Sequence, residues 1–144
     1  MITGMTDTGS MQVLERLVQF TGERHKHLAN NVANLSTPGY KPRDLSVDSF
    51  QEAMQAAVER RRQNTGGLGR ELDPRDTREI KFESNGIRAQ PHALSDNILF
   101  HDQNNRSLEH TMKDMAENAM THNAALEMLK SAYTGIETAI RERV

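Results

Sequence analysis

Residues 28–41 read LANNVANLSTPGYK, and this stretch decides where the first half of the chain stops being helical. The TPGY at residues 37–40 suits a type II turn, because Pro38 presets φ at the second position and Gly39 supplies a positive φ at the third. Proline also disfavours the α region for the residue before it, so a helix that arrives from the N-terminal side should end at or before Ser36. The stretch therefore predicts a helix followed by a tight turn.

Three asparagines lie just ahead of this turn. Asn is a poor helix former, and its amide can both donate and accept hydrogen bonds. The amides could be ordinary capping groups at a helix end, or they could bond to another molecule. We predict an assembly motif of seven residues: Asn30, Asn31, Asn34, Thr37, Pro38, Gly39 and Tyr40.

The composition favours an elongated helical or partly disordered chain. Only 35% of the 144 residues are hydrophobic and 4% aromatic, with no Trp. Burial of so little apolar surface must offset about 1–2 kcal/mol of backbone entropy per ordered residue. A compact globule is therefore the less natural expectation.

Charge and sorting signals restrict the function classes. The formal net charge of −2 gives no support for nucleic-acid binding. The chain has no cysteine, hence no disulfide or thiolate chemistry. No apolar run is long enough to span a bilayer, and the polar N-terminus lacks the features of a signal peptide. We expect a cytoplasmic protein or one exported without a cleaved signal.

Each end of the chain carries a heptad pattern. Residues 1–10 are expected to be flexible, and a helix is predicted over residues 11–36. A second helix is predicted over residues 107–143, with Ser107 as its N-cap. The predicted seam consists of Leu14, Val18, His25, Leu28, Val32 and Leu35 on the first helix, and Leu108, Met112, Met115, Ala119, His122, Leu126, Leu129, Tyr133, Ile136 and Ile140 on the second. The fold class is thus mainly α, with the terminal helices pairing as an antiparallel, coiled-coil-like hairpin.

The centre of the first seam is polar, since Thr21 and His25 occupy two successive heptad positions. With Leu35 placed near Leu108, an antiparallel pairing puts His122 opposite Thr21 and His25 opposite Ala119. We therefore expect the two histidines to meet, or nearly meet, in a polar layer that sets the register of the pair.

The middle of the chain is less regular. Residues 37–62 are predicted to form the turn and a short helix, for which Ser49 and Glu52 make a capping-box start. Residues 63–106 mix Arg and Lys with acids around several Gly, and are expected to be a solvated linker or a small irregular insert.

Two short segments within this insert could be strands. Residues 80–83 alternate weakly and precede a turn signal at Asn85-Gly86, and residues 98–100 form a small apolar island.

One cluster of residues could hold a metal ion. Glu23 and His27 lie four apart and so share a helix face, and His122 could add a third ligand. However, basic residues flank the cluster and no HExxH pattern is present. No catalytic triad or phosphate-binding loop is evident either. We expect no enzymatic activity, no metal and no cofactor.

The asparagine stretch and the turn resemble a known family. The segments ANNVAN at residues 29–34 and TPGYK at residues 37–41 are similar to the N-terminal signature of the bacterial flagellar rod, hook and hook-associated proteins. The C-terminal helix, with MAENA at residues 115–119 and LEML at residues 126–129, resembles the proximal rod members. The resemblance covers roughly residues 11–58 and 107–141.

The chain departs from that family at two places. It has Leu35-Ser36 before the turn and Thr121-His122-Asn123 in the second helix, where relatives carry other residues. These departures concern the fine packing.

The resemblance implies a structural subunit of the proximal rod in the basal body. Such a subunit would be exported through the flagellar type III apparatus and would reach the periplasmic rod. It would transmit torque and form part of the export channel wall, in contact with sibling rod proteins, ring components and the export gate. Nucleic acid, small-molecule substrates and a membrane span are not implied. The alternative is a coiled-coil adaptor or secretion chaperone, which would use the same heptads but would not need the Thr-Pro-Gly-Tyr stop.

Overall fold

A computed structural model describes residues 8–65, 72–84, 86–93 and 104–142. In chain order the elements are α1 (Thr8–Ala33), β1 (Arg43–Asp44), α2 (Val47–Thr65), β2 (Ile80–Glu83), β3 (Gly86–Ala89), β4 (His92–Ala93) and α3 (Asn104–Arg141). The predicted fold class is confirmed, since the two terminal helices are long and pack together.

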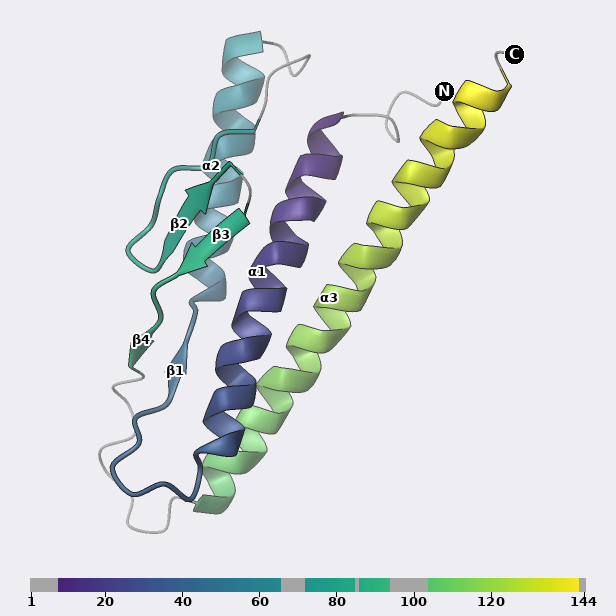
Figure 1. The fold of residues 1–144 in the computed structure, drawn as a ribbon. Helices are drawn as coiled ribbons and strands as arrows, with labels where there is room; N and C mark the ends of the chain where they lie inside the picture. The colour runs from purple at the N-terminus through teal and green to yellow at the C-terminus, as the bar shows by residue number, and fades with distance from the viewer. Residues whose placement is uncertain (1–7, 66–71, 85, 94–103, 143–144) are drawn as a thin grey trace.

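The helix α1 is the central element of the molecule (Figure 1). The helix α3 runs antiparallel along one side of it, while α2 and the small strands lie along the other side. Because α1 is covered from two sides, its sequence must supply two buried faces. The predicted seam accounts for only one of them.

The terminal helices begin earlier than expected. The first starts at Thr8 and ends at Ala33, so residues 8–10 belong to the helix. The last starts at Asn104, which places Ser107 inside the helix rather than at its N-cap. The N-terminal capping signal at Ser107 was therefore misleading.

The start of α2 is also different from the prediction. The Ser46 Oγ accepts a hydrogen bond from the Ser49 backbone N–H at 3.1 Å, so Ser46 is the N-cap. The Ser46 backbone N–H donates to Glu79 Oε2 at 2.8 Å. In a capping box that second bond comes from the N3 side chain. Here Glu79, which is distant in sequence, accepts the hydrogen bond from the Ser46 N–H. Glu52, the acid of the predicted capping box, is exposed.

Residues 72–84 and 86–93 form a small packed unit. The strands β2 and β3 make an antiparallel hairpin in which Ile80 pairs with Ala89 and Glu83 with Gly86. The two-residue strands β1 and β4 pair antiparallel as well. The predicted strand at residues 80–83 is therefore confirmed. Asn85 and the apolar island at residues 98–100 lie outside the described residues.

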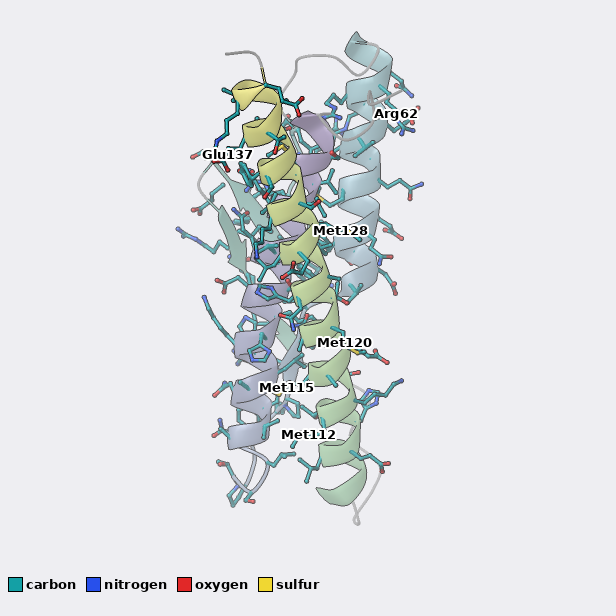
Figure 2. All side chains as sticks on the ribbon, turned by 90° about the vertical axis from the view of Figure 1, so that its right-hand side faces the viewer. Arg62, Met112, Met115, Met120, Met128 and Glu137 are labelled. Atoms are coloured by element: carbon teal, nitrogen blue, oxygen red, sulfur yellow. The ribbon has the colours of Figure 1, made fainter. Side chains whose placement is uncertain are left out.

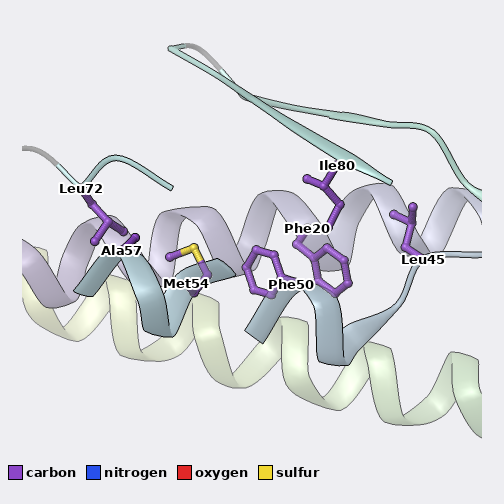
Figure 3. Packing of buried hydrophobic residues seen from close by; sticks show 7 residues of the cluster. All are labelled: Phe20, Leu45, Phe50, Met54, Ala57, Leu72 and Ile80. Carbon is purple, nitrogen blue, oxygen red and sulfur yellow. The ribbon is translucent and has the colours of Figure 1, made fainter. Parts of the chain in front are cut away.

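The hydrophobic core lies between α1, α2 and this hairpin (Figure 3). The Phe20 and Phe50 rings stack with centroids 4.2 Å apart, and Phe82 lies 6.3 Å from Phe50. The core cluster comprises Phe20, Leu45, Phe50, Met54, Ala57, Leu72 and Ile80. None of these residues belongs to the predicted seam. Leu72 and Ile80 are isolated apolar residues in a charged segment, and only tertiary packing shows that they are buried.

Polar contacts fasten the small unit to α1. The Arg24 guanidinium forms a two-pronged ion pair with the Asp44 carboxylate on β1, with a shortest distance of 2.7 Å. Burial lowers the pKa of Arg24, but the hydrogen bond and charge of Asp44, together with the charges of Asp114 and Glu117, raise it above its usual value. Arg16 Nη1 donates to the Glu83 and Gly86 carbonyls, each at 3.0 Å, and so holds the tip of the hairpin.

Candidate functional site: the asparagine turn and the helix seam

The turn after α1 has the predicted geometry. The Tyr40 backbone N–H donates to the Thr37 carbonyl at 3.2 Å, and Gly39 has a φ of 76°. These features define the type II turn expected from Pro38 and Gly39. The prediction for residues 37–40 is confirmed.

Asn31 is a buried amide that organises the chain after this turn. Its Oδ1 accepts hydrogen bonds from the Tyr40 hydroxyl at 2.9 Å and from the Arg43 N–H at 3.0 Å. Its Nδ2 donates to the Arg43 carbonyl at 2.7 Å. The amide thus pairs with both backbone groups of Arg43, as a neighbouring strand would. It fixes the position of β1 beside α1.

The other two asparagines also bond within the chain. Asn34 Nδ2 donates to the Asn30 carbonyl at 2.9 Å and to the Asn30 Oδ1 at 3.0 Å. Asn30 Nδ2 donates to the Tyr40 hydroxyl at 3.2 Å, and Thr37 Oγ1 donates to Asn34 Oδ1 at 3.3 Å. These contacts give the two amides partners within the chain, as capping groups at a helix end have. Part of the motif remains available as a surface, because Thr37, Pro38 and Gly39 are exposed.

The side chains of the predicted seam on α1 are buried to different extents. Leu28 is buried, whereas Leu14, Val18, His25 and Val32 are half-buried. Leu35, also half-buried, follows the end of the helix. The helix α3 therefore covers the seam side chains of α1 only in part.

On α3 the contact face is rotated relative to the prediction. Half of the predicted seam is half-buried, and these residues are Met115, Ala119, His122, Leu129 and Ile136. The other half is exposed, and these residues are Leu108, Met112, Leu126, Tyr133 and Ile140. The fully buried side chains of the described part of α3 are Asn118 and Ala125, one position before Ala119 and Leu126. Neighbouring residues of a helix are about 100° apart around its axis. The row of the predicted seam that contains Ala119 and Leu126 is therefore turned away from α1.

The exposed row leaves an apolar strip along α3. Met112, Leu126, Tyr133 and Ile140 recur at multiples of seven residues, and we call this row the outer stripe. Two further methionines, Met120 and Met128, are exposed elsewhere on the helix (Figure 2). In the described parts of the chain, all exposed large hydrophobic side chains belong to α3.

A hydrogen bond from Tyr133 links the outer stripe to α1. The Tyr133 hydroxyl donates to Glu15 Oε1 at 2.9 Å, and this hydrogen bond raises the pKa of Tyr133. Except for this contact at the edge of the helix pair, the phenol ring is exposed. Around the circumference of α3, Tyr133 therefore lies at the edge of the outer stripe, next to the face that contacts α1.

A polar layer lies in the middle of the α1–α3 contact. His122 Nδ1 is 2.8 Å from Thr21 Oγ1, which confirms the predicted opposition of these two residues. Asn118 Nδ2 donates to the Thr21 carbonyl at 2.9 Å. The described partner of His122 is thus Thr21 and not His25. Asn118 was missed from sequence because Ala119 fits the heptad equally well.

The possible metal ligands are engaged or dispersed. Glu23 Oε1 accepts a hydrogen bond from Lys26 Nζ at 2.6 Å, and His122 contacts Thr21. Among the residues with described positions, no group of three His, Cys, Asp or Glu is placed to hold a metal ion. Over the same residues, no helix combines the length and the apolar character that a membrane crossing requires.

Comparison with known proteins gives one informative likeness. The chain is 21% identical over 133 residues to the flagellar basal body rod protein FlgB of Bacillus subtilis strain 168. The match spans 92% of this chain and 94% of that protein. No protein-family model matches the chain. The likeness is low in identity but extends over nearly the full length of both proteins, and it supports the flagellar rod family. The name of the relative describes a rod component and not an enzyme.

Proposed function

We propose that the protein is a structural subunit of the proximal rod in the bacterial flagellar basal body. The observation that carries this proposal is the outer stripe of α3. A long helix that packs on its own chain with one face, and exposes a second apolar row at heptad spacing, is suited to side-by-side packing with further helices. The full-length likeness to a rod protein supports the same function.

Burial of the outer stripe would contribute substantially to assembly. Each large apolar side chain that becomes fully buried contributes about 1.5–3 kcal/mol. The four side chains of the stripe therefore offer several kcal/mol per subunit, before the costs of association are subtracted. Such a gain favours polymerisation of many subunits, each of which repeats the same contact.

The proposal includes partners and a place. The subunit packs with sibling rod proteins, and it contacts ring components and the export gate at the base of the rod. It reaches the periplasmic rod through the flagellar type III apparatus. In the rod its terminal helices form part of the export channel wall and transmit torque. The exposed turn residues Thr37, Pro38 and Gly39 are a second proposed contact with neighbours.

The test is a pair of matched substitutions in the organism that carries the gene. Met112→Gln removes apolar surface from the outer stripe, and Met120→Gln makes the same change at an exposed position outside it. Two readouts are used: swimming motility, and the amount of the protein in purified basal bodies. We expect Met112→Gln to reduce both, while Met120→Gln leaves both near normal. Normal basal bodies in the stripe variant, at normal protein levels, would contradict the proposal.

A further inference from the structure

The position of α3 along its own axis depends on its contact with α1. Among the described residues, no other element packs against α3 to a comparable extent. The strand β4 ends at Ala93 and α3 begins at Asn104. Ten intervening residues can span up to about 33 Å, whereas a slide of one heptad moves a helix by about 10 Å. The register is therefore argued from the contact between α1 and α3.

The apolar part of the seam does not select one register. On α1 the contact offers Leu14, Val18, Leu28 and Val32, and on α3 the contact face repeats with a period of seven residues. After a slide of one repeat, apolar or small side chains again meet apolar side chains. The apolar packing of such a seam is nearly as favourable after one helix has shifted by seven residues.

The polar layer is different, because it matches in one register only. Thr21 and Asn118 are 2% and 3% exposed, so their polar atoms depend on partners within the protein. In the observed pairing His122 meets the Thr21 hydroxyl, and Asn118 meets the Thr21 carbonyl. A slide of seven residues would place His122 opposite Leu14 or Leu28, and its ring nitrogen would lose this partner.

The hydrogen-bond directions follow from a count of protons. The Thr21 hydroxyl has one hydrogen, and its oxygen lies 2.8 Å from the Leu17 carbonyl and 3.1 Å from the Val18 carbonyl. The hydroxyl donates to these helix carbonyls, as Thr side chains commonly do in helices. In the tautomer with a hydrogen on Nδ1, His122 donates to Thr21 Oγ1 and leaves the hydroxyl hydrogen for the helix carbonyls. In this arrangement Thr21 bonds to its own helix and to both polar side chains of α3.

We infer that Thr21, Asn118 and His122 act as a register lock, which holds α3 at one axial position on α1. A lock of this kind selects one arrangement among several of similar stability and adds little to stability itself. Buried polar residues set register in this way in other helix pairs. The lock fixes which residues of the outer stripe stand beside which part of α1.

Crosslinking can read the register directly, because the chain contains no cysteine. Glu15→Cys combined with Tyr133→Cys reports the observed register, since these side chains are in contact. Glu15→Cys combined with Leu126→Cys or with Ile140→Cys reports slides of one heptad in either direction. With the polar layer intact, we expect a short thiol crosslinker to favour the Tyr133 pair by at least about tenfold.

Removal of the layer should mix the registers. In the background Thr21→Val, Asn118→Ala and His122→Leu, we expect crosslinks at all three pairs, with helix content by circular dichroism unchanged. A matched control changes the exposed neighbours, with Thr121→Val and Asn123→Leu, and should keep the single register. Exclusive crosslinking of the Tyr133 pair in the apolar background would overturn the inference.

Relocation of the layer gives a second test that does not depend on loss of order. Asn118→Ala and His122→Leu remove the α3 partners, and Thr111→Asn with Met115→His rebuilds them one heptad earlier. With Thr21 unchanged, we expect the Leu126 pair to become the dominant crosslink. If the Tyr133 pair remains dominant in this variant, the polar layer does not set the register.

Discussion

At the scale of single residues, the side chains that matter most are polar ones with complete sets of partners. Asn31 is 3% exposed and bonds to both backbone groups of Arg43 and to the Tyr40 hydroxyl. From sequence, its amide was a candidate for contacts with other subunits. In the structure it has a role that no pattern of helix periodicity reveals, because Arg43 lies beyond the turn.

We expect Asn31→Ala to lower the free energy of unfolding by about 2–3 kcal/mol, because it removes the three hydrogen bonds that Asn31 makes to Arg43 and Tyr40. The measurement is urea denaturation of the purified protein, followed by circular dichroism. Asn30→Ala is the matched control. Asn30 is exposed and bonds to Tyr40 at 3.2 Å, so its loss should cost less than about 1 kcal/mol. Equal effects of the two substitutions would show that the Asn31 network is not important for stability.

Two glycines should respond in opposite ways to the same substitution. Gly39 has a φ of 76°, so Gly39→Ala introduces strain of about 1–2 kcal/mol. Gly135 lies within α3, and a Cβ added there meets nothing within 4 Å. Gly135→Ala should therefore stabilise the protein by up to about 1 kcal/mol, because alanine is the better helix former. Thermal melts of the two variants beside the parent protein check both signs.

At the scale of elements, the sequence was sufficient for the two long helices, their antiparallel pairing and the turn between α1 and β1. It also placed His122 opposite Thr21, because this pairing follows once Leu35 is placed near Leu108. The rotation of α3 was not predictable, because its apolar residues form two overlapping heptad rows and the sequence does not say which pair of rows faces α1. The core around Phe20 and Ile80 was missed for a similar reason, since it joins isolated apolar residues from three segments.

Two substitutions test which acid caps the start of α2: Glu79, as in the structure, or Glu52, as predicted from the sequence. We expect Glu79→Ala to lower the free energy of unfolding by about 1 kcal/mol, because the Ser46 N–H loses its acceptor. Glu52→Ala removes the acid that the sequence pattern assigned to the cap, and it should have almost no effect on stability. Chemical denaturation of both variants decides the matter. A larger effect at Glu52 would restore the capping box predicted from sequence.

At the scale of the whole molecule, the helices α1 and α3 are covered by other elements to different extents. The helix α1 is covered by α3 on one side and by α2 and the strands on the other, whereas α3 exposes the outer stripe. Local stability follows buried contact. The protein should therefore lose order first in α3 and last in α1.

Hydrogen exchange on the dilute protein can measure this order. We expect amide protection to be highest between Leu14 and Leu28 and at least tenfold lower between Leu126 and Ile140, because the latter segment is covered on one face only. Addition of sibling rod proteins should raise protection in α3 selectively, if the outer stripe is their contact. Uniform protection of both helices in the dilute protein would contradict the unequal coverage.

The central position of α1 has a consequence for the order of events when the chain is made. The ring of Phe20 stacks on Phe50, and Thr21 meets His122 roughly a hundred residues later. A chain that emerges from a ribosome with its N-terminus first thus presents α1 long before the partners of α1 exist. The face of α1 that packs on α3 therefore stays open to capture by a chaperone until nearly the entire chain has appeared, whereas Phe50 follows Phe20 much sooner. The same delay would apply to a chain that leaves any narrow pore N-terminus first.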